Sequence, residues 1–124
     1  LDVQAKICGH AGFAHAPGWF TTAPIFAARK LLKKLGWQAS DVDVWEVNEA
    51  FAVVAMAFIR ELEIDPMHVN IHGGACALGH PIGASGARIL VSLLNALKKS
   101  EGSKGLAAIC LGGGEGIAVA VEAA

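Results

Sequence analysis

The sequence predicts an α/β protein with three layers, α/β/α, in which helices cover both faces of a mixed sheet. Two observations lead to this fold class. Apolar segments of strand character alternate with amphipathic segments of helical period, in the order β-α-β-α-β-α-β-β. The helical crossovers favour parallel strands, whereas a short turn at residues 112–116 predicts that the last strand is antiparallel to its neighbour.

The first half of the chain contains two predicted strands and two predicted helices. Residues 3–8 form a short apolar strand, and turn residues predict a loop from there to Pro24. A helix follows Pro24 and ends at Gly36. A β-rich strand at residues 42–47 leads into a helix at residues 48–63, whose apolar side chains recur at intervals of three and four.

The second half contains three predicted strands and one predicted helix. Residues 67–71 form a short third strand, and a glycine-rich loop begins at His72. An amphipathic helix follows at residues 83–99. Residues 104–111 form a continuous apolar run, as expected of a strand covered on both faces, and residues 117–121 form the last strand.

Composition narrows the classes of function. Residues 1–124 are expected to form a single domain. Hydrophobic residues make up 54% and charged residues 17%, so we expect a partner surface to cover part of this domain. The chain begins with leucine rather than methionine, which favours a fragment of a longer protein.

A net charge of −1 argues against nucleic-acid binding, and no apolar run reaches the ~18 residues needed to span a membrane.

Cysteine usage indicates a reducing compartment. The three cysteines, Cys8, Cys76 and Cys110, are odd in number and follow no disulfide spacing. The cytoplasm is therefore the predicted location, with an organelle matrix as the alternative. His72, Cys76 and His80 imitate helical metal ligands by their spacing of four, but the glycines between them argue against a helix, so no metal is expected.

Three polar positions stand out as candidates for chemistry. His80 lies in a segment of five glycines between residues 72 and 88, where Pro81 fixes the backbone after it; the alternative is a turn histidine that caps a helix. Cys110 lies near the end of a buried strand. It is either a small core residue or a functional thiol at the carboxyl end of a strand, where α/β sheets hold their sites. Asn48 follows a strand, where it either caps the next helix or binds a ligand.

Three motifs together resemble those of one protein family. GGACALGHPIGASGAR at residues 73–88, VNEAFA at residues 47–52 and CLGGGEG at residues 110–116 are similar to the C-terminal half of a thiolase, of the acetyl-CoA acetyltransferase type. The resemblance covers nearly the whole chain. It departs at residues 22–24, where thiolases usually have the end of a Gly-x-Gly-Pro sequence and this chain has Thr-Ala-Pro. The resemblance therefore does not define the detailed shape of this loop.

The resemblance implies a role for each candidate residue. Cys110 would be the acid/base cysteine that exchanges a proton with the methyl group of acetyl-CoA. His80 would stabilise negative charge on a thioester oxygen and activate the nucleophile. Asn48 would hold a water that assists His80. Gly112 would contribute a backbone N–H to the site, and Phe51, which its spacing places mainly in the core, would lie beside the acyl group.

The implied reaction joins two acetyl-CoA molecules into acetoacetyl-CoA and CoA, or reverses this by thiolysis. It would proceed through an acyl-cysteine, with acetyl-CoA and CoA as substrates and no further cofactor. The nucleophilic cysteine would come from the N-terminal thiolase half, the expected partner, and the complete enzyme would be a homo-oligomer. The chain alone is then expected to be inactive. The alternatives are a longer-chain 3-ketoacyl-CoA thiolase and a non-catalytic acyl-CoA- or lipid-binding module.

Overall fold

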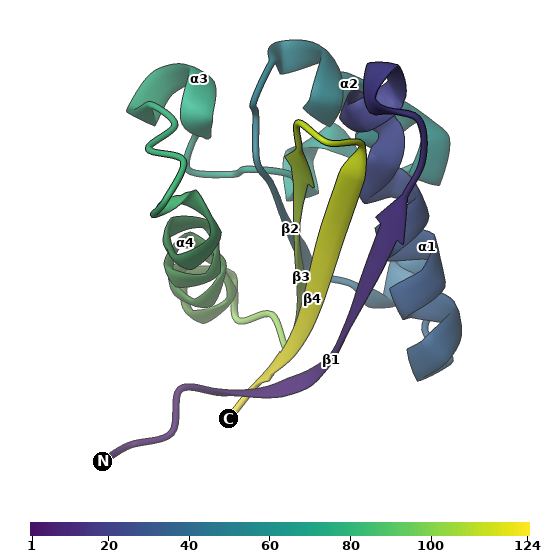
Figure 1. Ribbon diagram of the computed structural model, residues 1–124. Helices are drawn as coiled ribbons and strands as arrows, with labels where there is room; N and C mark the ends of the chain where they lie inside the picture. The colour runs from purple at the N-terminus through teal and green to yellow at the C-terminus, as the bar shows by residue number, and fades with distance from the viewer.

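The computed structural model describes residues 1–124 and contains a four-stranded mixed sheet (Figure 1). The strands are β1 (Ala5–Ala14), β2 (Val44–Val47), β3 (Lys104–Leu111) and β4 (Glu115–Ala123), and their order in the sheet is β1-β4-β3-β2. β2 is parallel to β3, and β4 is antiparallel to both of its neighbours. The predicted mixed sheet with an antiparallel last strand is therefore confirmed.

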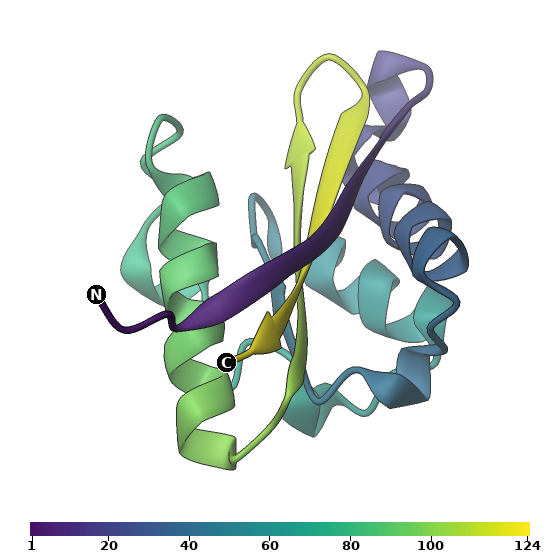
Figure 2. The ribbon, with the colours of Figure 1, turned by 90° about the horizontal axis from the view of Figure 1, so that it is seen from below.

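Helices cover both faces of this sheet. Helices α1 (Ala23–Leu35) and α2 (Ala52–Leu62) lie against one face, and α4 (Ser85–Ser100) lies against the other (Figures 1 and 2). The one-turn helix α3 (Ala75–Leu78) precedes α4. Short 3-10 turns occur at Pro17–Thr22, Ala39–Asp41 and Pro66–His68. The three layers agree with the predicted fold class. No helix has the length and apolar content required to span a bilayer.

Two apolar clusters form the core, one on each face of the sheet. Trp45 and Val47 of β2 pack with Phe58 and other residues on the α1/α2 side, whereas Val44 packs with Ile89 on the α4 side. Side chains along a strand alternate between the two faces. The two polar residues at positions 46 and 48 therefore lie on the α4 side of β2, next to the buried stripe of α4.

The first strand is longer than its pattern predicts. Residues 3–8 were the expected strand, but β1 continues to Ala14 because it pairs with β4 along its whole length, with a bulge at Cys8. Pairing to a neighbouring strand thus overrides the turn signals of the glycines in this segment. The predicted long loop to Pro24 is correspondingly reduced to a short connection that contains the 3-10 turn at Pro17–Thr22.

The predicted third strand at residues 67–71 is wrong. Only Val69 forms a bridge, to Trp45, because the next residue leaves the extended conformation: Asn70 has φ of 49°. The amide of Asn70 replaces the missing ladder, since its Oδ1 accepts from the N–H of Val47 at 2.8 Å and its Nδ2 donates to the carbonyl of Val47 at 2.9 Å. The side chain of Asn70 thus satisfies the backbone N–H and carbonyl of Val47 on β2. The backbone after Val69 can therefore turn towards α3.

Two boundaries also differ from the prediction. The helix expected from residue 48 begins at Ala52, because the residues before it remain extended or form a bend. The turn expected at residues 112–116 is shorter, since Leu111 and Glu115 are already paired across the β3–β4 hairpin. The later start of α2 lengthens the irregular backbone at the carboxyl end of β2. The shorter turn reduces the irregular backbone at the end of β3.

Candidate active site

The carboxyl ends of β2 and β3 place two of the predicted residues at the same edge of the sheet. Asn48 is the first residue after β2, and its backbone N–H donates to the carbonyl of Ala108 on β3 at 2.9 Å. Cys110 lies two residues further along β3. The loop between α3 and α4, which carries His80, reaches the same edge (Figure 1). This edge is where ligand sites of α/β sheets form.

A chain of hydrogen bonds joins Asn48 to the α3–α4 loop. Nδ2 of Asn48 lies 3.3 Å from Nε2 of His80, and Nδ1 of His80 lies 2.6 Å from Oγ of Ser85. The hydroxyl of Ser85 donates its one proton to the carbonyl of Pro81 at 3.1 Å. Ser85 must therefore accept at its other contact, so Nδ1 of His80 carries the proton. In the neutral ring, Nε2 is then the acceptor, and it faces Nδ2 of Asn48.

The orientation of the Asn48 amide follows from the same network. Its Oδ1 accepts from Nη2 of Arg88 in the first turn of α4, at 3.5 Å, so its Nδ2 faces His80. The side chain of Asn48 is fully buried. The alternative that Asn48 caps a helix is wrong, because α2 begins four residues later and Phe51 occupies the cap position.

Glu49 holds the glycine-rich loop against the end of β2. Its carboxylate accepts from the N–H of Cys76 at 2.9 Å and from Nδ2 of Asn70 at 3.1 Å. A side chain at Gly74 would collide with this carboxylate, and Gly79 has φ of 91°, a conformation that favours glycine. These two glycines allow the loop to pass close to β2 and then to turn directly into His80.

Cys110 occupies an apolar environment. Its side chain is buried in the core cluster on the α1/α2 side. Burial raises the pKa of the Cys110 thiol above its ordinary value, so the thiol holds its proton at neutral pH. Gly112 follows in the exposed tip of the hairpin, where its N–H makes no backbone hydrogen bond. A buried, protonated thiol thus precedes a backbone N–H that has no backbone acceptor.

The helical spacing of Phe51 predicts that it lies in the core, and this prediction is wrong. It precedes α2 in extended backbone, and its side chain is 61% exposed. Its ring lies edge-on to that of Phe20, with centroids 6.2 Å apart. The two rings form an apolar surface beside the loop that begins with Asn48.

The sequence alone does not identify several residues of the site. Ser85 and Glu49 lie inside the motifs, yet nothing in the sequence alone shows that they contact His80 and the α3 loop. Glu46 is a detectable exception, because a carboxylate interrupts an otherwise apolar strand. Arg88 is a second such exception, because it interrupts the apolar pattern at the start of α4.

The prediction that no helix occurs between His72 and His80 is wrong. The glycines there predict no helix, but Ala75–Leu78 form one helical turn that includes Cys76. Even so, no three His, Cys, Asp or Glu side chains are grouped to hold a metal ion. Cys76 is exposed, and its backbone N–H donates to the carboxylate of Glu49.

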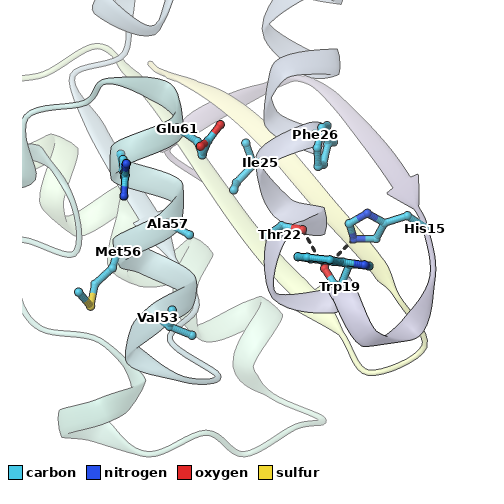
Figure 3. Close-up of a pocket in the computed structure, with 10 residues that line it drawn as sticks. His15, Trp19, Thr22, Ile25, Phe26, Val53, Met56, Ala57 and Glu61 are labelled. Atoms are coloured by element: carbon cyan, nitrogen blue, oxygen red, sulfur yellow. Dashed lines mark hydrogen bonds between the residues drawn. The ribbon is translucent and has the colours of Figure 1, made fainter.

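A large cavity lies away from this network. It has a volume of about 720 Å³ and opens between the 3-10 turn at Pro17–Thr22, α1 and α2. Figure 3 shows Val53 and Ala57 of α2 on the side of that helix that faces Trp19 and Ile25. Neither His80, Asn48 nor Cys110 lines this cavity. It therefore adds exposed apolar surface rather than a part of the hydrogen-bonded site.

Comparison with known proteins gives consistent matches. The family described as "Thiolase, C-terminal domain" matches residues 1–123. Acetyl-CoA acetyltransferase 1 of Arabidopsis thaliana is 52% identical over 122 residues, which cover 98% of this chain and 29% of the relative. Cytosolic acetyl-CoA acetyltransferase of Rattus norvegicus is 53% identical over 122 residues, 98% of this chain and 31% of the relative. The mitochondrial acetyl-CoA acetyltransferase of the same organism is 54% identical over 118 residues, 95% of this chain and 27% of the relative.

Solved structures show the same likeness. The crystal structure of Acat5 thiolase from Ascaris suum in complex with coenzyme A matches with a TM-score of 0.95 and 48% identity, over 100% of this chain and 32% of that chain. The acetyl-CoA acetyltransferase of Bacillus anthracis matches with a TM-score of 0.97 and 43% identity, over 100% of this chain and 32% of that chain. The present chain thus spans about a third or less of the length of these relatives.

Proposed function

Because this chain belongs to the thiolase C-terminal domain family, we propose that it is the C-terminal catalytic half of an acetyl-CoA C-acetyltransferase. The enzyme joins two acetyl-CoA molecules into acetoacetyl-CoA and CoA, or catalyses the reverse thiolysis. The observation that carries this proposal is the Asn48–His80–Ser85 network, at the same sheet edge as the buried thiol of Cys110. Relatives named acetyl-CoA acetyltransferase support the choice of substrate.

The first half-reaction uses His80 as a base. Its unprotonated Nε2 takes the proton of a nucleophilic cysteine supplied by the N-terminal thiolase half, and the thiolate attacks the thioester of acetyl-CoA. The resulting imidazolium donates from Nε2 to the negatively charged thioester oxygen. Nδ1–H of His80 keeps donating to Oγ of Ser85 during these steps. This hydrogen bond fixes the ring so that Nε2 is directed at the reacting atoms. CoA leaves as its thiol with the proton from Nε2 of His80, which returns the ring to its neutral form, and the acyl-cysteine remains.

The second half-reaction uses Cys110. The ionised form of Cys110, a minor form at neutral pH because burial raises the pKa of the thiol, removes a proton from the methyl group of a second acetyl-CoA, and the enolate attacks the acyl-cysteine. The released nucleophile recovers a proton from Cys110. In thiolysis, the thiol of Cys110 protonates the departing enolate, a step for which its raised pKa is suited because the thiol holds a proton at neutral pH.

The remaining candidate residues surround these two groups. We propose that Asn48 holds a water which, with His80, stabilises the enolate oxygen. The free N–H of Gly112 contributes to the anion site beside Cys110. Phe51, exposed and paired with Phe20, forms part of the acyl pocket.

Partners and location belong to the same proposal. Residues 1–124 form one domain that pairs with an N-terminal thiolase half, and the complete enzyme is a homo-oligomer. It acts on acetyl-CoA and CoA as substrates without a further cofactor or metal. We propose the cytoplasm as its location, the compartment in the name of one rat relative; an organelle matrix is the alternative, since another rat relative is mitochondrial.

The length of the preferred acyl chain tests this proposal. The enzyme completed by its N-terminal half is expected to cleave acetoacetyl-CoA with a kcat/KM at least roughly tenfold above that for 3-ketooctanoyl-CoA, because several extra methylenes must enter a pocket shaped for a short acyl group. Thiolysis of both compounds is measured with CoA as the second substrate. A preference for the longer compound would assign a 3-ketoacyl-CoA thiolase instead. Acyl-CoA binding without any turnover would assign a binding module.

A further inference from the structure

A carboxylate is buried in the centre of the apolar strand β2. Glu46 is 1% exposed, and all four residues of β2 are buried. It lies on the α4 side of the strand, between Val44 and Asn48, where Val44 packs into the apolar cluster. Neither Oε1 nor Oε2 of Glu46 has a hydrogen-bond partner. An ionised group in such a place is costly unless an opposite charge compensates it.

The compensating charge comes from the first turn of α4. Nε and Nη1 of Arg88 are buried and also lack partners, while Nη2 donates to Oδ1 of Asn48. The buried donors of Arg88 and the buried acceptors of Glu46 complement each other. The two groups have no N–O distance within 4.0 Å, but attraction acts over longer distances where water is excluded. Burial raises the pKa of Glu46 to about 7, and the positive charge of Arg88 opposes this rise.

We propose that Glu46 and Arg88 are positioning residues that set the orientation of the Asn48 amide and, through it, the direction of His80. This inference rests on the proposed function of Asn48 and His80. The interactions follow one another in order. The charge of the carboxylate attracts the guanidinium without direct contact, and the guanidinium donates to Oδ1 of Asn48 and so leaves Nδ2 facing Nε2 of His80. A flipped Asn48 amide would instead present a second acceptor to the unprotonated Nε2.

Two single variants in the enzyme completed by its N-terminal half separate the contributions. Arg88→Met keeps an unbranched apolar stem but removes the charged group that donates to Asn48, and is expected to lower kcat for thiolysis by roughly 10²-fold with little change in KM, because the reacting groups are misplaced. Glu46→Gln is expected to have a smaller effect, since its amide oxygen remains an acceptor facing Arg88. Arg29→Gln removes the exposed ion pair with Glu61 and serves as the matched control with near-normal kcat.

The double variant distinguishes positioning from stability. Glu46→Gln combined with Arg88→Met leaves no buried charge, so the midpoint of thermal unfolding is expected to recover towards that of the wild type. The kcat is expected to stay at the level of Arg88→Met, because Asn48 still lacks its donor. Recovery of kcat together with thermal stability, or an unchanged kcat in Arg88→Met, would overturn the inference.

A spectroscopic measurement separates this inference from the proposed function. Turnover of the wild type tests the function, whereas the ¹⁵N chemical shifts of the His80 ring report its protonation and hydrogen bonds without turnover. The Nε2 resonance is expected to move in Arg88→Met and in the double variant, but not in Arg29→Gln. Unchanged His80 shifts in both Arg88 variants would overturn the positioning role even if the wild type is an active thiolase.

Discussion

Replacement of Cys110 by alanine is expected to leave acylation of the nucleophile intact and to abolish carbon–carbon bond formation. His80, not Cys110, activates the nucleophile in the proposed mechanism, so acetyl transfer to the enzyme continues. The methyl protons of acetyl-CoA lose their acceptor, and removal of a positioned acid/base group typically costs about 10²–10⁴-fold in rate. Mass spectrometry of the acetylated protein and exchange of the acetyl methyl protons in D₂O measure the two steps separately.

A matched cysteine provides the control for this variant. Cys8 lies in β1, remote in the sheet order from β2 and β3, and Cys8→Ala is expected to retain both acylation and exchange. Cys110→Ser preserves a proton-bearing group, but its hydroxyl is a far weaker acid than a thiol and is expected to restore little exchange. Wild-type exchange in Cys110→Ala would show that another group carries the methyl proton.

Replacement of His80 by alanine is expected to block the reaction earlier, at acylation. The variant lacks the base that takes the proton of the nucleophile and the donor to the thioester oxygen, and loss of one such donor alone costs about 10²–10³-fold in turnover. Acetylated protein should therefore fail to accumulate when His80→Ala is mixed with acetyl-CoA. Pre-steady-state mass measurements compare the rate of acetylation with that of the wild type.

Ser85→Ala is the variant that isolates the ring orientation. It keeps the imidazole but removes the acceptor at Nδ1, so its acetylation rate should fall between those of the wild type and His80→Ala. Rapid acetylation of His80→Ala would assign activation of the nucleophile to a residue outside this chain. The two variants together show whether His80 acts through Nε2.

The strongest local patterns are sufficient to predict most of the fold. The apolar run at residues 104–111 coincides with β3, and Gly36 ends α1 in the left-handed conformation expected of a helix cap. The errors arise where distant residues decide the local structure. β1 extends because β4 pairs with it, and Val69 stays outside a full strand because the Asn70 side chain takes the place of a backbone partner.

The site is predictable in composition but not in connection. The motifs contain His80, Asn48 and Cys110, yet the contact between Asn48 and His80 joins residues 32 positions apart, and no local pattern encodes it. Phe51 has helical spacing but precedes the helix, so its predicted burial is wrong. The role of Glu46 depends on a charge from α4 that is 42 positions away in sequence and becomes visible only when the layers are packed.

Exposed apolar surface connects the fold to its proposed partner. Phe51, Val53 and Met56 are each more than half exposed beside the cavity between α1 and α2 or close to it. Burial of each such side chain contributes about 1.5–3 kcal/mol, so that together they are comparable to the ~5–15 kcal/mol stability of a domain. We expect the chain alone to bind hydrophobic dyes or to self-associate.

The most direct test of the proposed function uses the 124 residues and an N-terminal thiolase half prepared separately. Thiolysis of acetoacetyl-CoA is measured for each half alone and for their mixture, with dye binding followed in parallel. Neither half alone should be active, and the mixture should regain thiolysis and lose dye binding, because the nucleophile and the acid/base groups lie in different halves. A monodisperse, dye-silent monomer of these 124 residues that transfers acetyl groups unaided would contradict the proposal.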